Sequence, residues 1–119
     1  MAVLSLHSQV VRGHVGNSAV QFALQRQGHS VWNMPTVVYS NHPGHGGYKG
    51  RATPVSELLD LIEGLDERGW LPKVQAVLTG YIGEDDQIDA LVEAVDRVKG
   101  ANPDAIYVCD PVIGDKNGK

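Results

Sequence analysis

Residues 107–115 read Tyr-Val-Cys-Asp-Pro-Val-Ile-Gly-Asp. The apolar first part of this stretch ends in Asp110, Pro111 follows, and Asp115 brings a second carboxylate. A short apolar run that stops at a proline is typical of a buried strand in a parallel sheet. Ligands of open α/β sheets bind just outside the carboxyl ends of the strands. We therefore expect an active site to begin at Asp110.

Upstream of this stretch, strand-like and helix-like patterns alternate. The strand-like segments are short and apolar, and they cover residues 2–6, 31–39, 74–78 and 105–109. The helix-like segments repeat apolar residues every three or four positions, and they begin at Asn17 or Ser18, at Pro54 and at Asp85. Gly28 is expected to end the first helix. This order predicts an α/β fold, with a mostly parallel central sheet and helices on both faces.

Two details of the pattern bear on burial. The apolar stripe of the last helix consists of Ile88, Leu91, Val92, Val95 and Val98. Cys109 lies in the apolar run of the last strand, where we expect it to be a small buried hydrophobic residue.

No helix follows the last strand to cover it, although strands of such sheets are normally buried on both faces. We infer that residues 1–119 form the N-terminal portion of a single larger domain whose C-terminal portion is absent from this chain.

The composition limits the class of protein. The 119 residues include 42% hydrophobic and 20% charged residues, which is ordinary for a globular domain with its own core. The net charge is −4 without a block of like charges, so we expect neither nucleic acid nor a membrane surface as a partner. A single cysteine excludes a disulfide framework, and no secretion signal or long apolar run is present. These features predict a cytoplasmic protein.

Asp110 and Asp115 are candidate ligands for a divalent cation, because Mg²⁺ is often held by one or two carboxylates together with phosphate oxygens. The alternative is that Asp110 caps the turn before Pro111 and that Asp115 lies in a solvated turn. A zinc site is not expected, since His42 and His45 have no third ligand near them in sequence.

The segment from Ser8 to Ser18 follows the first strand and is predicted to be a loop. Ser8 could bind a ligand, and Gly13 and Gly16 could allow the backbone to approach it closely. The alternative is an ordinary connection, because the glycine pattern matches neither the dinucleotide-binding nor the Walker phosphate-binding motif. Tyr81 follows the third strand, where it could stack on an aromatic substrate or cover the edge of the core.

Five blocks of the sequence together resemble pyridoxal kinases. They are Leu4-Ser5-Leu6-His7-Ser8, Gly13-His14-Val15-Gly16-Asn17, Ser40-Asn41-His42, Leu78-Thr79-Gly80-Tyr81 and residues 109–115. The blocks follow the order and spacing of that family and cover essentially the whole chain. The resemblance implies a ribokinase-like fold, incomplete in this chain, and ATP-dependent phosphorylation of the 5′-hydroxyl of pyridoxal, pyridoxine or pyridoxamine in vitamin B6 salvage. It also implies Mg²⁺, leaves a monovalent cation open as a further cofactor, and implies a homodimer.

The resemblance assigns roles to individual residues of the substrate site. Ser8 corresponds to a serine that binds the pyridine ring, Val38 and Tyr39 to positions that line the pocket, and Tyr81 to a tyrosine beside the substrate. His42 opens a flap formed by residues 40–50.

The flap departs from the family pattern. The family commonly has threonine where Pro43-Gly44 stands in this sequence. Proline offers neither a hydroxyl nor a backbone N–H. We expect the substrate contact at this point to be lost or to be taken over by His45, and the preference among the vitamers is open.

The resemblance also assigns the nucleotide side of the site. Asp110 corresponds to an aspartate near the ATP phosphates and the metal, and Asp115 to a second acid near the cation. The family's catalytic aspartate lies in a Gly-x-Gly-Asp segment, which these 119 residues do not contain. We therefore expect catalytic residues downstream of this chain, and no kinase activity from residues 1–119 alone.

Two alternatives to a pyridoxal kinase remain open from the sequence. The chain could be a non-catalytic fragment that binds vitamin B6 or dimerises. The protein could also be a related ribokinase-fold kinase for another small alcohol, such as hydroxymethylpyrimidine. A receiver-like phosphoacceptor domain fits poorly, because it would need a pair of acids after the first strand.

Overall fold

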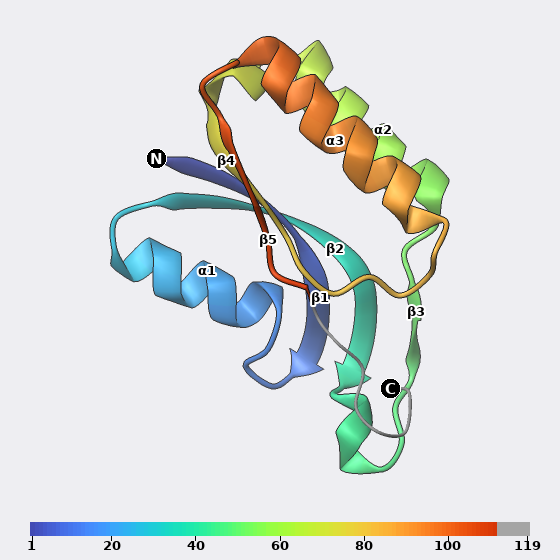
Figure 1. The fold of residues 1–119 in the computed structure, drawn as a ribbon. Helices are drawn as coiled ribbons and strands as arrows, with labels where there is room; N and C mark the ends of the chain where they lie inside the picture. Colours follow the sequence, from blue (N-terminus) through green and yellow to red (C-terminus); the bar gives the residue numbers. More distant parts are fainter. Residues whose placement is uncertain (112–119) are drawn as a thin grey trace.

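The computed structural model describes residues 1–111, which form a five-stranded sheet in the order β3-β2-β1-β4-β5 (Figure 1). The strands are β1 (Ala2–Arg12), β2 (Ser30–Asn41), β3 (Gly50–Ala52), β4 (Val74–Thr79) and β5 (Ile106–Cys109). β1 pairs in parallel with β2 and β4, and β4 pairs in parallel with β5. Only the short β3 runs antiparallel, beside β2. The predicted mostly parallel sheet is confirmed.

Helices cover both faces of this sheet (Figure 1). α1 (Asn17–Arg26) lies on one face, and α2 (Val55–Glu67) and α3 (Gln87–Ala101) lie side by side on the other. Short 3-10 helices, η1 (Pro43–His45) and η2 (Leu71–Lys73), interrupt two of the connections. Within residues 1–111, no helix combines the length and the apolar character needed to cross a bilayer.

The main core lies between the sheet and the pair α2 and α3. Its members are buried apolar side chains from β1, β2, β4 and these helices, with Leu71 from η2 and Ala105 just before β5: Leu4, Leu6, Met34, Leu58, Ile62, Leu71, Val74, Val77, Ala90, Ala94, Val98 and Ala105. Gly28 ends α1 with a φ of 87°, as predicted, because a left-handed residue is most easily glycine.

β1 is longer than the sequence predicts. The strand was expected to end at Leu6, but it continues to Arg12, and Ser8 therefore lies within a strand rather than in a loop. The pairing with β2 shifts register here: His7 pairs with Pro35, and Gln9 already pairs with Val38. The extra residue in β2 is a bulge, which lets β1 pair beyond the proline.

The start of α1 also differs from the prediction. Gly16 precedes the helix, and neither Asn17 nor Ser18 caps it. The buried side chain of Asn17 instead accepts a hydrogen bond from Ser5 Oγ at 2.6 Å and donates one to the carbonyl of His7 at 3.1 Å. The side chain of Asn17 therefore connects α1 to β1, and it does not accept a hydrogen bond from the backbone N–H groups at the start of α1.

The predicted apolar stripe of α3 faces the core only in part: Val98 is buried and Leu91 and Val95 pack against the core. Ala90, Ala94 and Val98 are buried, whereas the predicted stripe members Ile88 and Val92 are 48% and 52% exposed. The small alanine side chains allow α3 to lie close to its neighbours, and the larger residues are left at the margin.

β5 is parallel as predicted, but it is not buried. It forms an edge of the described sheet, and all four of its residues are exposed. Cys109 is a free and exposed cysteine, so the expectation of a buried residue is wrong. Within residues 1–111, β5 lies at the edge of the sheet and packs chiefly against β4, so its side chains stay accessible.

Candidate active site

His7 lies at the centre of the predicted site. Its Nδ1 accepts a hydrogen bond from the backbone N–H of Ser8 at 2.8 Å and another from that of Tyr81 at 3.3 Å. Burial lowers the pKa of His7, and the nearby charge of Asp110 opposes that shift. A neutral ring that accepts at Nδ1 carries its proton on Nε2. His7 thus joins the middle of β1 to the segment after β4.

Ser8 is half-buried beside His7, and its hydroxyl lies 3.3 Å from Nδ1 of that ring. The segment between β1 and α1 folds back toward Ser8, and Gly16 in this segment packs directly against the backbone and hydroxyl of Ser8. A Cβ at position 16 would collide with these atoms, and Gly16 also has a φ of 56°. The close approach expected of this glycine is therefore made to Ser8 itself.

Three tyrosines gather between β2, the flap and the segment after β4. The rings of Tyr39 and Tyr48 have centroids 4.5 Å apart. Burial, with the neighbouring hydroxyls of Tyr81 and Tyr48, raises the pKa of Tyr39 to about 12. The aromatic groups offer apolar faces with polar tips, which suits a heteroaromatic ligand that carries hydroxyl groups.

Asp110 directly follows β5, as Gly80 and Tyr81 follow the neighbouring strand β4, so it lies on the same side of the sheet as Tyr81 and His7. Its backbone N–H donates to the carbonyl of Thr79 at 2.8 Å, and its side chain is exposed. Within residues 1–111, Asp110 forms no ion pair. Asp115, the second predicted metal ligand, lies outside the described residues.

A cation at this point would need ligands beyond the described side chains. Among residues 1–111, no three His, Cys, Asp or Glu side chains lie close enough together to hold a metal ion. Mg²⁺ commonly takes one or two carboxylates and completes its shell with phosphate oxygens and water. One free carboxylate at a strand end, such as Asp110, fits a cation that arrives with a nucleotide.

The flap is held by hydrogen bonds within itself. The N–H of Ser40 donates to the carbonyl of Lys49 at 2.7 Å. The side-chain amide of Asn41 donates to the carbonyl of Gly47 at 2.8 Å. His42 Nδ1 accepts from the N–H of Gly44 at 2.9 Å. These bonds close residues 40–50 into a compact turn.

Gly44, His45 and Val38, which are also predicted site residues, are exposed. Pro43, Gly44 and His45 form η1, with Gly44 and His45 exposed. Val38 is 42% exposed on β2, opposite Arg51. The structure thus places Ser8, Tyr81 and Asp110 around His7, and Tyr39 connects Tyr81 with Tyr48 of the flap.

His7 and Tyr48 were not predicted as site residues. His7 belongs to the first block that carries the resemblance, and it immediately precedes Ser8. That position was the available signal for His7. Tyr48 lies in the flap and has no signal of its own, because its packing against Tyr39 depends on how the flap folds back.

The chain was compared with known proteins. No family model matches it. It is 48% identical over 114 residues to the pyridoxal kinase PdxY of Corynebacterium diphtheriae, which covers 96% of this chain and 40% of the relative. The solved pyridoxal kinase of Leishmania donovani, in complex with ADP and pyridoxamine, is 38% identical with a TM-score of 0.91, over 97% of this chain and 42% of that one.

A solved structure with a different description shares the fold. It is a putative phosphomethylpyrimidine kinase from Bacteroides thetaiotaomicron, 26% identical with a TM-score of 0.85, over 97% of this chain and 38% of that one. The chain therefore spans about two fifths of the length of the relatives that it matches. The predicted resemblance is confirmed: in sequence and in fold, this chain is related over nearly its whole length to the pyridoxal kinases and has their ribokinase-like α/β architecture.

Proposed function

We propose that the protein to which this chain belongs phosphorylates the 5′-hydroxyl of pyridoxal with ATP, giving pyridoxal 5′-phosphate in vitamin B6 salvage. The observation that carries the proposal is the meeting of Ser8, Tyr81 and Asp110 around His7, in a chain 48% identical to a pyridoxal kinase. In this proposal, residues 1–119 supply the substrate-binding half of one kinase domain.

The vitamer side of the proposed site consists of Ser8, Tyr81 and the residues near them. Ser8 would hydrogen-bond the pyridine ring, and Tyr81 would pack beside it. Val38 and Tyr39 would line the pocket, and residues 40–50 would cover it and limit the access of water. Pro43, Gly44 and His45 would contact the substrate only after the flap moves toward it. Pyridoxine and pyridoxamine are further candidate substrates.

The nucleotide side of the proposed site begins at Asp110. This carboxylate, together with Asp115, would hold Mg²⁺, which neutralises charge on the phosphates when it is bound. In the reaction, the 5′-oxygen bonds to the γ-phosphorus of ATP, the bond from that phosphorus to the leaving ADP oxygen breaks, and the hydroxyl proton passes to a base. We assign that base to a part of the protein outside this chain.

The setting of the reaction is also part of the proposal. We place the protein in the cytoplasm, because the one cysteine among these 119 residues, Cys109, is a free thiol. We propose a homodimer on the resemblance alone. ATP as co-substrate is supported by the ADP bound in the solved Leishmania donovani kinase.

A coupled assay of the complete protein tests this function. ADP release and pyridoxal phosphate formation are measured with pyridoxal, pyridoxine and pyridoxamine, and separately with hydroxymethylpyrimidine and ribose. We expect turnover with pyridoxal. Turnover of hydroxymethylpyrimidine or ribose without any of the three vitamers would contradict the proposal.

A second candidate function is phosphorylation of a hydroxymethylpyrimidine. The likeness to the Bacteroides thetaiotaomicron structure, with a TM-score of 0.85, favours a substituted methylpyrimidine as the class of substrate, because that structure is described as a putative phosphomethylpyrimidine kinase. Its identity of 26% is lower than the 38% to the Leishmania donovani pyridoxal kinase, so the vitamer remains the preferred substrate. The same assay decides between the two.

A third candidate is that the 119-residue chain acts alone as a binding or dimerising unit without catalysis. The isolated chain is expected to show no ATP-dependent formation of pyridoxal phosphate. Measurable formation would refute the division of the site that we propose.

A further inference from the structure

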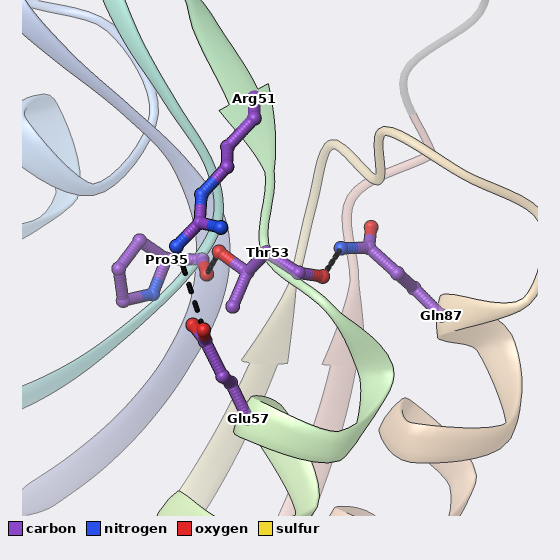
Figure 2. A network of polar contacts seen from close by, with 5 residues as sticks. All are labelled: Pro35, Arg51, Thr53, Glu57 and Gln87. Carbon is purple, nitrogen blue, oxygen red and sulfur yellow. Dashed lines mark hydrogen bonds and ion pairs between the residues drawn. The ribbon is translucent and has the colours of Figure 1, made fainter.

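One buried amide joins three separate segments of the chain. The side chain of Gln87, the first residue of α3, is 0% exposed. Its Nε2 donates to the carbonyl of Thr36 at 2.7 Å and to that of Thr53 at 2.8 Å, and its Oε1 accepts from the N–H of Gly83 at 2.9 Å. Figure 2 shows the bond from Gln87 to Thr53. Both donor hydrogens of the amide are therefore used.

Two threonines extend this connection to Tyr81 and to β2. The hydroxyl of Thr36, which is itself fully buried, donates to the carbonyl of Tyr81 at 2.5 Å. The hydroxyl of Thr53 donates to the carbonyl of Pro35 at 2.7 Å (Figure 2). The backbone N–H of Thr53 donates to the carbonyl of Thr36 at 2.8 Å. The segment that carries Tyr81 is thus bonded directly to β2.

These bonds replace a missing part of the sheet. β3 pairs with β2 only at residues 37–39, so the carbonyls of Pro35 and Thr36 lie beyond the end of that ladder. Buried carbonyls without a strand partner need another donor. Gln87 and Thr53 provide it. Gly83 packs closely in the same place, because a Cβ there would collide with the side chain of Val37.

The three segments that meet at Gln87 are those expected to surround the vitamer. β2 continues from Thr36 to Tyr39, Thr53 directly follows β3 at the end of the flap, and Gly83 ends the segment that carries Tyr81. We propose that Gln87 is a positioning residue, which fixes Tyr81 relative to β2 and to the base of the flap and thereby sets the affinity for the vitamer. This inference rests on the proposed kinase function.

Three substitutions in the complete protein test this role. Gln87→Glu keeps the shape and the acceptor but removes both donors, Thr36→Val removes the hydroxyl that holds Tyr81, and Thr36→Ser keeps it. We expect Gln87→Glu and Thr36→Val each to raise the KM for pyridoxal about tenfold, which corresponds to about 1.4 kcal/mol. The KM for ATP should stay within about twofold of wild type, and Thr36→Ser should restore the wild-type KM for pyridoxal.

A matched control lies next to the network. Arg51 and Glu57 form an ion pair at 3.4 Å with side chains 72% and 51% exposed (Figure 2). Exposed pairs of this kind contribute little, so Glu57→Gln should leave both KM values unchanged. A KM for pyridoxal that stays at the wild-type value in Gln87→Glu and Thr36→Val, or a KM for ATP that rises equally, would overturn the proposal.

A second measurement keeps the inference testable if the complete protein does not phosphorylate pyridoxal. Such a result refutes the proposed function alone, and hydrogen exchange then reports on the connection itself. Gln87→Glu should speed amide exchange both at residues 81–83 and at residues 50–53, while Glu57→Gln should not. Faster exchange in only one of the two segments, or in neither, would overturn the positioning role.

Discussion

The imidazole ring of His7 occupies the space where a side chain at position 80 would lie, so that only glycine fits beside it. Gly80 itself is fixed by its N–H, which donates to the carbonyl of Leu6 at 2.9 Å. This packing holds the end of β4 against the middle of β1 and leaves Ser8 and Tyr81 within hydrogen-bonding distance of one ring.

Gly80→Ala should destabilise the complete protein by about 1–3 kcal/mol, because the added methyl group collides with the ring of His7. Urea unfolding measures the loss. Combination with His7→Ala should relieve the collision, so that the double variant loses less stability than the sum of the two single ones. Gly64→Ala is the control, since a Cβ at position 64 meets nothing within 4 Å. Equal losses in Gly80→Ala and Gly64→Ala would contradict the packing.

His7→Phe should raise the KM for pyridoxal about tenfold, a change of about 1.4 kcal/mol, because an aromatic ring remains while the acceptor for Ser8 and Tyr81 is lost. His7→Asn keeps a polar group near the position of Nδ1, so its KM for pyridoxal should lie between that of the wild type and that of His7→Phe. Steady-state kinetics with pyridoxal and with ATP varied in turn make the comparison. If His7→Phe binds pyridoxal as tightly as wild type, the hydrogen bonds of Nδ1 do not position the vitamer.

Tyr39 should be among the last tyrosines to ionise as the pH rises. Burial, reinforced by Tyr81 and Tyr48, raises its pKa from 10.0 to about 12. Between these values the folded chain holds a proton that the unfolded chain has lost, so the free energy of unfolding falls as the pH rises through this interval. Tyr39→Phe should remove this part of the fall. The difference in tyrosinate absorbance between the wild type and Tyr39→Phe, followed as the pH is raised, gives the pKa of Tyr39 directly. A midpoint of this difference near pH 10 would contradict the burial of Tyr39.

Pro43→Thr should lower the KM for pyridoxal. Threonine supplies the hydroxyl and the backbone N–H that proline lacks, and one new hydrogen bond of about 0.5–1.5 kcal/mol corresponds to roughly a two- to tenfold change. Kinetics with pyridoxal and pyridoxine also show whether the preference between vitamers moves. His45→Ala serves as the companion variant: a large rise in its KM, with no gain in Pro43→Thr, would mean that His45 already provides the contact.

The sequence predicts those features of the fold that depend on local pattern. The alternation of strands and helices and the glycine stop at Gly28 follow from periodicity and backbone freedom, and both are confirmed. The location of Asp110 directly after a parallel strand follows in the same way. The length of β1 does not, because its extension past Ser8 depends on a bulge in a strand far along the chain.

Features that depend on distant neighbours could not be read from the pattern. Helical spacing shows that α3 is amphipathic, but it does not show that the alanines rather than Ile88 and Val92 face the core. Gln87 follows Glu84-Asp85-Asp86 and resembles the solvated start of a helix, yet its partners Thr36 and Thr53 lie 51 and 34 positions away. The exposure of Cys109 follows from the place of β5 at the sheet edge, which composition does not reveal.

The most direct test of the account is a pair of substitutions on the two sides of the site. Ser8→Ala and Asp110→Asn are compared with the wild-type complete protein by steady-state kinetics, with pyridoxal and MgATP varied in turn. The account predicts that Ser8→Ala raises the KM for pyridoxal and not that for ATP, and that Asp110→Asn lowers kcat and raises the KM for MgATP while the KM for pyridoxal changes little. Equal effects of both variants on both substrates, or no effect of either, would contradict it.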